Sequence, residues 1–126
     1  MKKKLNNHEA DAISKALIDV VNLKTEIPVK TGFKIAWNAD VLAKATDVYH
    51  KERDRIIRSL APDGQNINKK SDPDLYQKCT DKLTELSMLE IEVDIKELEM
   101  SEIENLEFPI KQMFALMFIT KKEGDD

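Results

Sequence analysis

Few side chains of this sequence combine in a pattern that could support chemistry, and the best group lies in one helical stretch. Tyr49, Lys51 and Arg53 occupy every second position, and Trp37 precedes them by about three helical turns. Arginine and lysine form charge-assisted hydrogen bonds with anions, and aromatic rings stack on planar or cationic groups. These four residues therefore predict a binding site for a small anionic ligand, such as a nucleotide, at an interface between subunits.

Residue types that are typical of catalytic or metal sites are scarce. His8 and His50 lack the spacing of a zinc site, Cys79 is the only cysteine, and the three glycines are isolated, so no phosphate-binding loop is indicated. Carboxylates of the second half could bind magnesium in an acidic helical hydrolase, but their spacing forms no inward-facing quartet. We therefore predict that the protein is not an enzyme and uses neither metal nor cofactor. The carboxylates in question are Glu85, Glu90, Glu92, Asp94, Glu97 and Glu99.

A long amphipathic helix positions the candidate ligand residues. Residues 35–60 carry a seam with alternating spacings of four and three, which is typical of a helix packed on a partner helix. The helix is predicted to begin near Val29, after Pro28. A second apolar face carries Trp37, Val41 and Val48, so the helix is expected to lie between two partners. The seam consists of Ile35, Ala39, Leu42, Thr46, Tyr49, Arg53, Ile56 and Leu60.

Arg53 is the one charged member of that seam, and burying it without a partner would cost several kcal/mol. Three explanations stay open: its head group reaches water, it pairs with an acidic residue of the second half, or it contacts a ligand.

Two further helices are predicted on either side of the long one. Asn6 or Asn7 caps a first helix, and Asp72 or Ser71 starts a third one, with Pro73 in its first turn. The turn 61–64 separates the long helix from a polar loop over 65–72. The inner face of the first helix comprises Ile13, Leu17, Val20 and Val21; that of the third comprises Leu75, Cys79, Leu86, Leu89 and Val93, with Cys79 as a buried hydrophobic residue.

The last third of the chain is harder to assign. Residues 90–98 alternate between apolar and charged, which indicates a short strand, although a continued helix fits as well. A strand would need a partner, either near 25–29 or in another subunit. Ser101 and Glu104 have the spacing of a capping box, which predicts a short helix. Residues 110–120 are apolar almost all round, as expected for a core helix or an oligomer contact.

Composition limits the class of protein. The 126 residues fit one mainly helical domain, 1–126, with a long central helix packed on two or three others and one short strand near 91–98. The single cysteine excludes an intrachain disulfide, and no stretch approaches the ~20 apolar residues of a spanning helix. We therefore expect a cytoplasmic protein without membrane contact.

Charge divides the chain into two unlike halves. Residues 1–70 hold 14 Lys and Arg against 9 Asp and Glu, a net charge of +5, whereas residues 71–126 hold 6 against 15, a net charge of −9. The halves could complement each other within one fold, associate head to tail between chains, or offer the basic half to an anion. The overall acidity argues against nucleic acid as a partner.

Several stretches resemble a family of small uncharacterised proteins encoded by phages and prophages of Gram-positive bacteria. The resemblance lies in Ile27-Pro28-Val29-Lys30 leading into a long helix, in Tyr49 with Glu52-Arg53, and in the closing 113–119 segment, and it spans roughly residues 5–119. It implies a phage origin and a small accessory role, in the cytoplasm of the host, and it supplies no catalytic residues.

Two functions follow as expectations. The first is a non-enzymatic, homo-oligomeric binding protein that sequesters or inhibits a host molecule, either a host protein or an anionic nucleotide signal of a defence system. The second is a virion assembly or tail accessory protein that works through self-association, for which the apolar 110–119 segment and the opposite charges of the two halves would serve.

Overall fold

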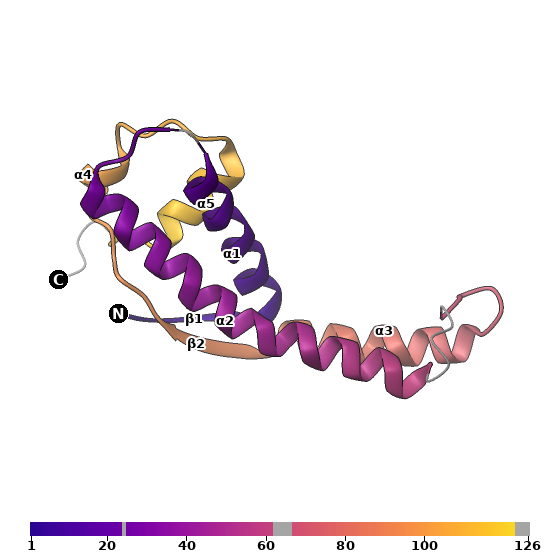
Figure 1. Cartoon of the computed structure of the whole chain (residues 1–126). Coiled ribbons are helices and arrows are strands. Elements are labelled where there is room, and N and C mark those ends of the chain that lie inside the picture. The colour runs from indigo at the N-terminus through magenta and orange to yellow at the C-terminus, as the bar shows by residue number, and fades with distance from the viewer. Residues whose placement is uncertain (24, 62–66, 123–126) are drawn as a thin grey trace.

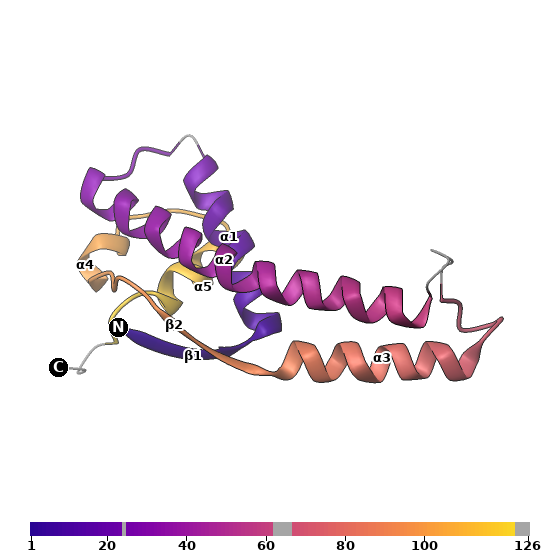
Figure 2. The same ribbon diagram turned by 60° about the horizontal axis from the view of Figure 1, so that its bottom comes forward.

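The computed structural model describes residues 1–23, 25–61 and 67–122, and it is mainly helical with one short two-stranded sheet, as predicted. A body is formed by the sheet, by most of the helices and by the first half of the longest helix, while the second half of that helix leaves the body beside another helix (Figures 1 and 2). The elements are β1 (Lys2–Asn6), α1 (Asn7–Asn22), α2 (Val29–Leu60), α3 (Pro73–Met88), β2 (Glu90–Asp94), α4 (Met100–Ile103) and α5 (Ile110–Phe118).

Helix α2 is the spine of the molecule, and its predicted seam is the stripe that the fold buries. Ile35 and Leu42 are almost fully buried, and Ala39, Thr46 and Ile56 are buried as well. The alternation of three and four residues keeps these side chains on one side, where they meet α1 near the start of the helix and α3 near its end. The helix starts at Val29, as predicted, and ends at Leu60; residues 62–66 of the predicted turn and loop lie outside the described residues.

Helix α1 packs across the first half of α2, and its start shows a complete capping box. The Asn6 side chain accepts a hydrogen bond from the Glu9 N–H at 2.8 Å, and the Glu9 side chain accepts one from the Asn6 N–H at 3.1 Å. Leu17 and Val20 are fully buried, as expected. Val21 is exposed, contrary to the prediction, because one residue step along a helix turns the side chain by about 100° away from the buried face.

Residues 90–94 form a strand, and its partner is the start of the chain rather than 25–29 or another subunit. β2 pairs antiparallel with β1, with Lys2 opposite Asp94, Lys4 opposite Glu92 and Leu5 opposite Ile91. In this register the exposed face carries opposite charges across the ladder, while the other face buries Leu5 and Val93. The run of three lysines hid this strand, since only one of its five residues is strongly apolar.

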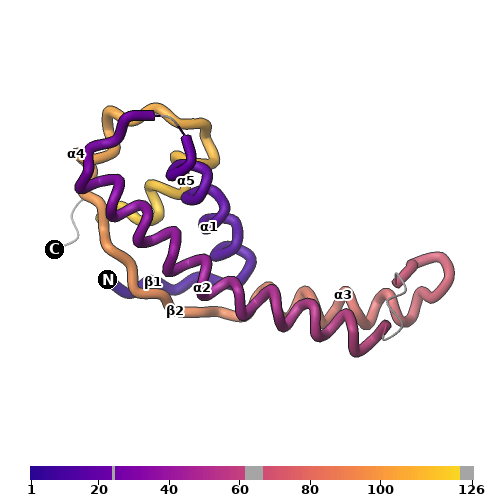
Figure 3. Tube along the Cα trace, in the orientation of Figure 1, coloured from indigo at the N-terminus to yellow at the C-terminus, as the bar shows by residue number. Residues whose placement is uncertain are grey.

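The arm, defined here as residues 49–60 of α2 together with α3, projects from the body as two antiparallel helices (Figure 3). Asp72 caps α3 by accepting a hydrogen bond from the Leu75 N–H at 3.1 Å, and Pro73 occupies the first turn, as predicted. Cys79 is 7% exposed and Leu86 is buried, which confirms the inner face at these two positions. Leu89, by contrast, is exposed, because it follows the end of α3 and begins the turn into β2.

The last two helices close the body. The capping box of α4 lies two residues before the predicted one and joins Glu99 to Glu102, because the helix starts at Met100 rather than after Ser101. In α5, Ala115 and Leu116 are buried, whereas Phe114 is 64% exposed. The apolar segment is therefore a core helix on one side and an uncovered apolar surface on the other.

Candidate binding surfaces

The four predicted ligand residues all lie on α2, but one chain does not bring them together. Twelve residues separate Trp37 from Tyr49, which corresponds to about 18 Å along a helix. Lys96 lies over the Trp37 ring, 4.5 Å from its centroid, and the Tyr49 ring lies 5.5 Å from that of His50. Lys51 pairs with Asp47 at 2.9 Å. An anion that contacts all four would need residues from more than one subunit.

Arg53 keeps its seam position with its head group partly in water. Its side chain is 43% exposed, and its Nε lies 3.7 Å from Oδ1 of the neighbouring Asp54. Among the described residues, its ion-pair partner therefore comes from its own helix rather than from the second half of the chain. The first of the three explanations agrees best with this arrangement.

A hollow of about 500 Å³ lies beside Tyr49, between α2 and the junction of α3 with β2. Its floor is apolar and includes Val48, Leu89 and Ile91. Three carboxylates border it, those of Glu52, Glu90 and Glu92. An anion would be repelled by these carboxylates, so the charge of this hollow suits a cationic or neutral group.

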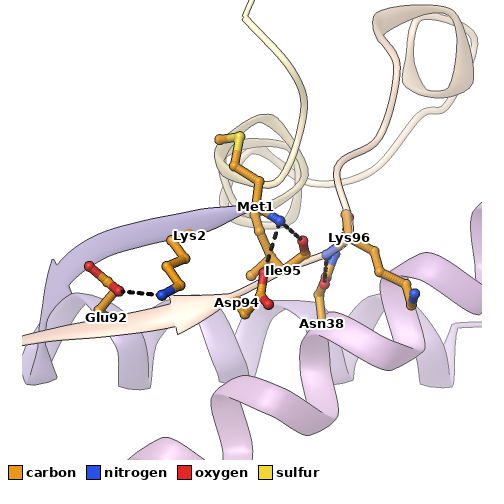
Figure 4. A network of polar contacts seen from close by, with 7 residues as sticks. All are labelled: Met1, Lys2, Asn38, Glu92, Asp94, Ile95 and Lys96. Atoms are coloured by element: carbon orange, nitrogen blue, oxygen red, sulfur yellow. Dashed lines mark hydrogen bonds and ion pairs between the residues drawn. The ribbon is translucent and has the colours of Figure 1, made fainter.

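A second hollow, of about 660 Å³, lies beside Trp37 and Val41, and ordered polar contacts form its wall (Figure 4). The Met1 ammonium donates hydrogen bonds to Oδ1 of Asp94 at 2.9 Å and to the Ile95 carbonyl at 2.7 Å. The hydrogen bond from the ammonium holds the pKa of the Asp94 carboxyl below its usual range.

Asn38 fixes the chain that leaves β2. Its Nδ2 donates a hydrogen bond to the Lys96 carbonyl and its Oδ1 accepts one from the Lys96 N–H, both at 2.7 Å. The side chain is fully buried. The Asn38 side chain thus makes the two hydrogen bonds that a neighbouring strand would otherwise make to the Lys96 backbone. The helical pattern alone did not reveal this role, although Asn38 lies three positions after the buried Ile35.

The third hollow is a groove of about 670 Å³ between α1 and α5, called here the α1–α5 groove. Its walls are mainly apolar and include Ile13, Ala16, Phe114 and Phe118. The side-chain oxygen Oε1 of Gln112 is buried and has no hydrogen-bond partner among the described residues. Sequence reasoning singled out the apolar segment 110–120 but not this groove, since the groove requires two helices that are about 100 residues apart.

Two charged residues that line this groove, Asp11 and Lys15, are ion-paired with each other. His50 Nε2 lies 2.7 Å from Oδ1 of Asp11, and Lys15 donates to the same carboxyl at 2.9 Å. Burial raises the pKa of the Asp11 carboxyl, but the hydrogen bonds from Lys15 and His50 outweigh burial and leave the pKa below its usual range. The Asp11 carboxyl is therefore ionised at neutral pH and satisfied within the fold.

Within residues 1–23, 25–61 and 67–122, no three His, Cys, Asp or Glu side chains lie close enough to hold a metal ion. None of the helices in the described part of the chain is long and apolar enough to cross a membrane. Comparison with protein-family models, with curated proteins and with solved structures finds no match to this chain.

Proposed function

We propose that this protein is a non-enzymatic binding protein that holds an apolar helical segment of a partner protein in the α1–α5 groove. The observation that carries this proposal is the groove itself, which is large, open and mainly apolar, with the exposed Phe114 ring at its side. Helix-binding grooves present such apolar floors between charged rims. Exposed aromatic side chains at such sites provide much of the binding energy.

The charges of the rim favour a protein segment over a small anion. Lys15 and Lys111 are balanced by Asp11 and Asp19, and Lys15 is already paired with Asp11. A phosphate would find no concentration of positive charge there. A helix that carries both charges beside an apolar stripe matches such a rim.

The resemblance to phage-encoded proteins implies an accessory role, and we propose that the partner is a host protein that the complex inhibits. The anionic nucleotide predicted from Trp37, Tyr49, Lys51 and Arg53 is the weaker proposal, because these residues are dispersed along α2.

Titration calorimetry with synthetic amphipathic helices of Leu, Ala, Lys and Glu tests the groove. We expect saturable binding that Phe114→Ala weakens about tenfold, which corresponds to about 1.4 kcal/mol. Ile110→Ala is the matched control, since Ile110 is exposed on the same helix but does not line the groove. The amide NMR signals that shift on binding should belong to α1 and α5.

Two results would contradict the groove. One is an equal loss of binding in the Phe114 and Ile110 variants. The other is tight binding of a nucleotide that disappears in Arg53→Ala, which would support the anionic ligand instead.

A further inference from the structure

The two-stranded sheet leaves one edge of β2 without a neighbouring strand, and hydrogen bonds at the ends of the ladder show which backbone groups face that edge. The Ile95 N–H donates to the Met1 carbonyl at 2.8 Å, and the Asn7 N–H donates to the Leu89 carbonyl at 3.1 Å. Along an antiparallel pair, such residues alternate with residues whose N–H and C=O groups point away from the partner strand. The odd-numbered residues of β2 therefore bond β1, and the even-numbered ones point to the other edge, called here the outer edge.

The backbone groups that β2 turns to the outer edge are those of Glu90, Glu92 and Asp94. In the described part of the chain, no hydrogen bond reaches the N–H or C=O of these three residues. At Lys96, the next even-numbered residue, Asn38 of α2 bonds both backbone groups at 2.7 Å (Figure 4). Asn38 thus occupies the end of the outer edge, while residues 90–94 keep donors and acceptors for a further strand.

The hollow beside Tyr49 lies along this part of the outer edge. Glu90, Ile91 and Glu92 of β2 line it, together with Val48 and Tyr49 of α2. Side chains of an added strand would alternate between two faces, one directed into the apolar hollow and one directed toward the carboxylates of β2. Val48 is 68% exposed, so the apolar surface that such a strand would cover is free in this chain.

Charge specifies the chemistry of the added strand. Three carboxylates border the hollow, and no lysine or arginine is among the described residues that line it. Arg55 pairs with Glu52, but no described residue forms an ion pair with Glu90. β1 shows which side chains suit these carboxylates, because Lys4 lies opposite Glu92 in the ladder.

We propose that the outer edge of β2 binds an extended basic segment of a partner protein, which adds to the sheet as a third strand beside α2. In this segment lysine or arginine alternates with apolar residues, so that basic side chains lie opposite Glu90 and Glu92 and apolar ones enter the hollow. Asn38 limits the strand at Lys96. No residue is shared between this hollow and the α1–α5 groove, so the site is distinct from the proposed helix site.

Titration calorimetry with a short blocked peptide in which lysine alternates with valine tests the site. We expect saturable binding, and a peptide of the same composition in which all lysines precede all valines should bind at least about tenfold more weakly. Methylation of alternate backbone amides separates strand addition from attraction between charges. Methylating the amides that face β2 should abolish binding, whereas methylating the other set should weaken it by less than about threefold. Equal effects of the two methylated peptides would overturn the third strand.

Hydrogen exchange followed by NMR reports on the outer edge directly. The amides of Glu90 and Glu92 should exchange rapidly in the free protein and slowly in the complex, because only the peptide supplies their acceptors. The amides of Ile91 and Val93, which bond β1, should exchange slowly in both states. Slow exchange of Glu90 and Glu92 without the peptide would overturn the proposal.

Charge reversal tests the role of the carboxylates. Glu90→Lys should weaken the alternating peptide about threefold to tenfold. Glu107→Lys is the matched control, because Glu107 is exposed outside the hollow and carries the same change of charge. Circular dichroism should show that both variants keep their helical content. Equal losses in the two variants, or no binding of the alternating peptide at millimolar concentration, would overturn the site.

The two proposed sites can fail separately. Phe114→Ala should leave binding of the alternating peptide unchanged, because Phe114 lines the α1–α5 groove and not this hollow. Glu90→Lys should likewise leave binding of an amphipathic helix unchanged. A loss of the alternating peptide in Phe114→Ala equal to that in Glu90→Lys would contradict a separate site on β2.

Discussion

At the scale of single residues, the fold depends on polar side chains that satisfy backbone groups far away in the sequence. Asn38 binds both backbone groups of Lys96, and Asn7 donates from Nδ2 to the Leu86 carbonyl at 2.9 Å. Both asparagines are buried, so these hydrogen bonds satisfy side chains that water does not reach. Removing either side chain leaves a backbone group without its hydrogen-bond partner.

Asn38→Ala is therefore expected to lower the free energy of unfolding by about 1–3 kcal/mol, since two partly buried hydrogen bonds to the Lys96 backbone are lost. Urea unfolding measures this change. Asn105→Ala is the control, because Asn105 is exposed and should change the stability by less than about 0.5 kcal/mol. Similar losses in the two variants would argue against the role of Asn38.

The pKa of the Glu102 carboxyl predicts how the stability of the fold depends on pH. Burial raises the pKa of its carboxyl, but hydrogen bonds from the Glu99 N–H, Lys34 and Thr31 outweigh burial and lower the pKa below the ordinary value of 4.5. A carboxyl with a lowered pKa stabilises the fold above its unfolded pKa, and this stabilisation is lost as the pH falls through the folded pKa.

We expect the stability of the native protein to fall below about pH 4.5. Glu102→Gln should be less stable at neutral pH and should lose less stability on acidification. Glu104→Gln, at an exposed position, should follow the native pH curve in the same unfolding experiments. A Glu102→Gln curve parallel to that of the native protein would contradict the assignment.

Arg53 and Asn38 show what could be predicted for individual residues. The position of Arg53 on the seam follows from helical spacing alone. A charged residue at a seam position also raises the question of which group it pairs with. The role of Asn38 depends on a chain segment 58 residues later, and no local pattern encodes that contact. For the same reason the α1–α5 groove could not be predicted, whereas the apolar segment that forms one of its walls could.

At the scale of elements, the helices were predictable because their signals are local. Pro28 and Asp72 mark the starts of α2 and α3, and the three-four spacing marks the buried face of α2. β1 was not predicted, because its lysines do not resemble a strand by themselves. Lys2 and Lys4 lie opposite acidic residues of β2, which is about 90 residues later in the chain. Strand pairing of this kind depends on cross-strand neighbours, which a single segment does not contain.

The arm is expected to be the least stable part of the described structure. Within residues 49–60 and α3, only Ile56, Cys79 and Leu86 are buried. Amides near the outer end of the arm should therefore exchange with deuterium faster than those of residues 31–42, because opening the arm exposes little apolar surface. A thiol reagent should reach Cys79 in the folded protein, and modification should be little affected by Leu17→Ala, which weakens the body. Equal protection of arm and body would contradict this expectation.

At the scale of the whole molecule, the opposite charges of the two halves meet within one chain. Lys2 lies 3.6 Å from Glu92, and Lys34 lies 3.0 Å from Glu102. The first pair is exposed and contributes little, whereas the second is largely buried and holds α4 against the start of α2. The opposite charges of the two halves thus form ion pairs that connect β1 with β2 and α2 with α4.

A substitution at Leu5 tests how much the pairing of β1 with β2 contributes to stability. It is 4% exposed and is the one strongly apolar side chain of β1, so Leu5→Ala is expected to lower the free energy of unfolding by about 2–4 kcal/mol. Leu23→Ala is the matched control, because Leu23 is exposed at the end of α1, and its loss should cost less than about 1 kcal/mol. Chemical denaturation compares the two variants, and a smaller effect at Leu5 than at Leu23 would show that β1 contributes little.

The pairing of Lys2 with Asp94 also dictates an order of events during synthesis. β2 is translated about 90 residues after β1, an interval on the order of 5–20 s at 5–20 residues per second. Until then the lysine-rich start of the nascent chain has no sheet to join, and Asn7 cannot reach the Leu86 carbonyl. The two-stranded sheet can therefore close only after residues 90–94 have been translated.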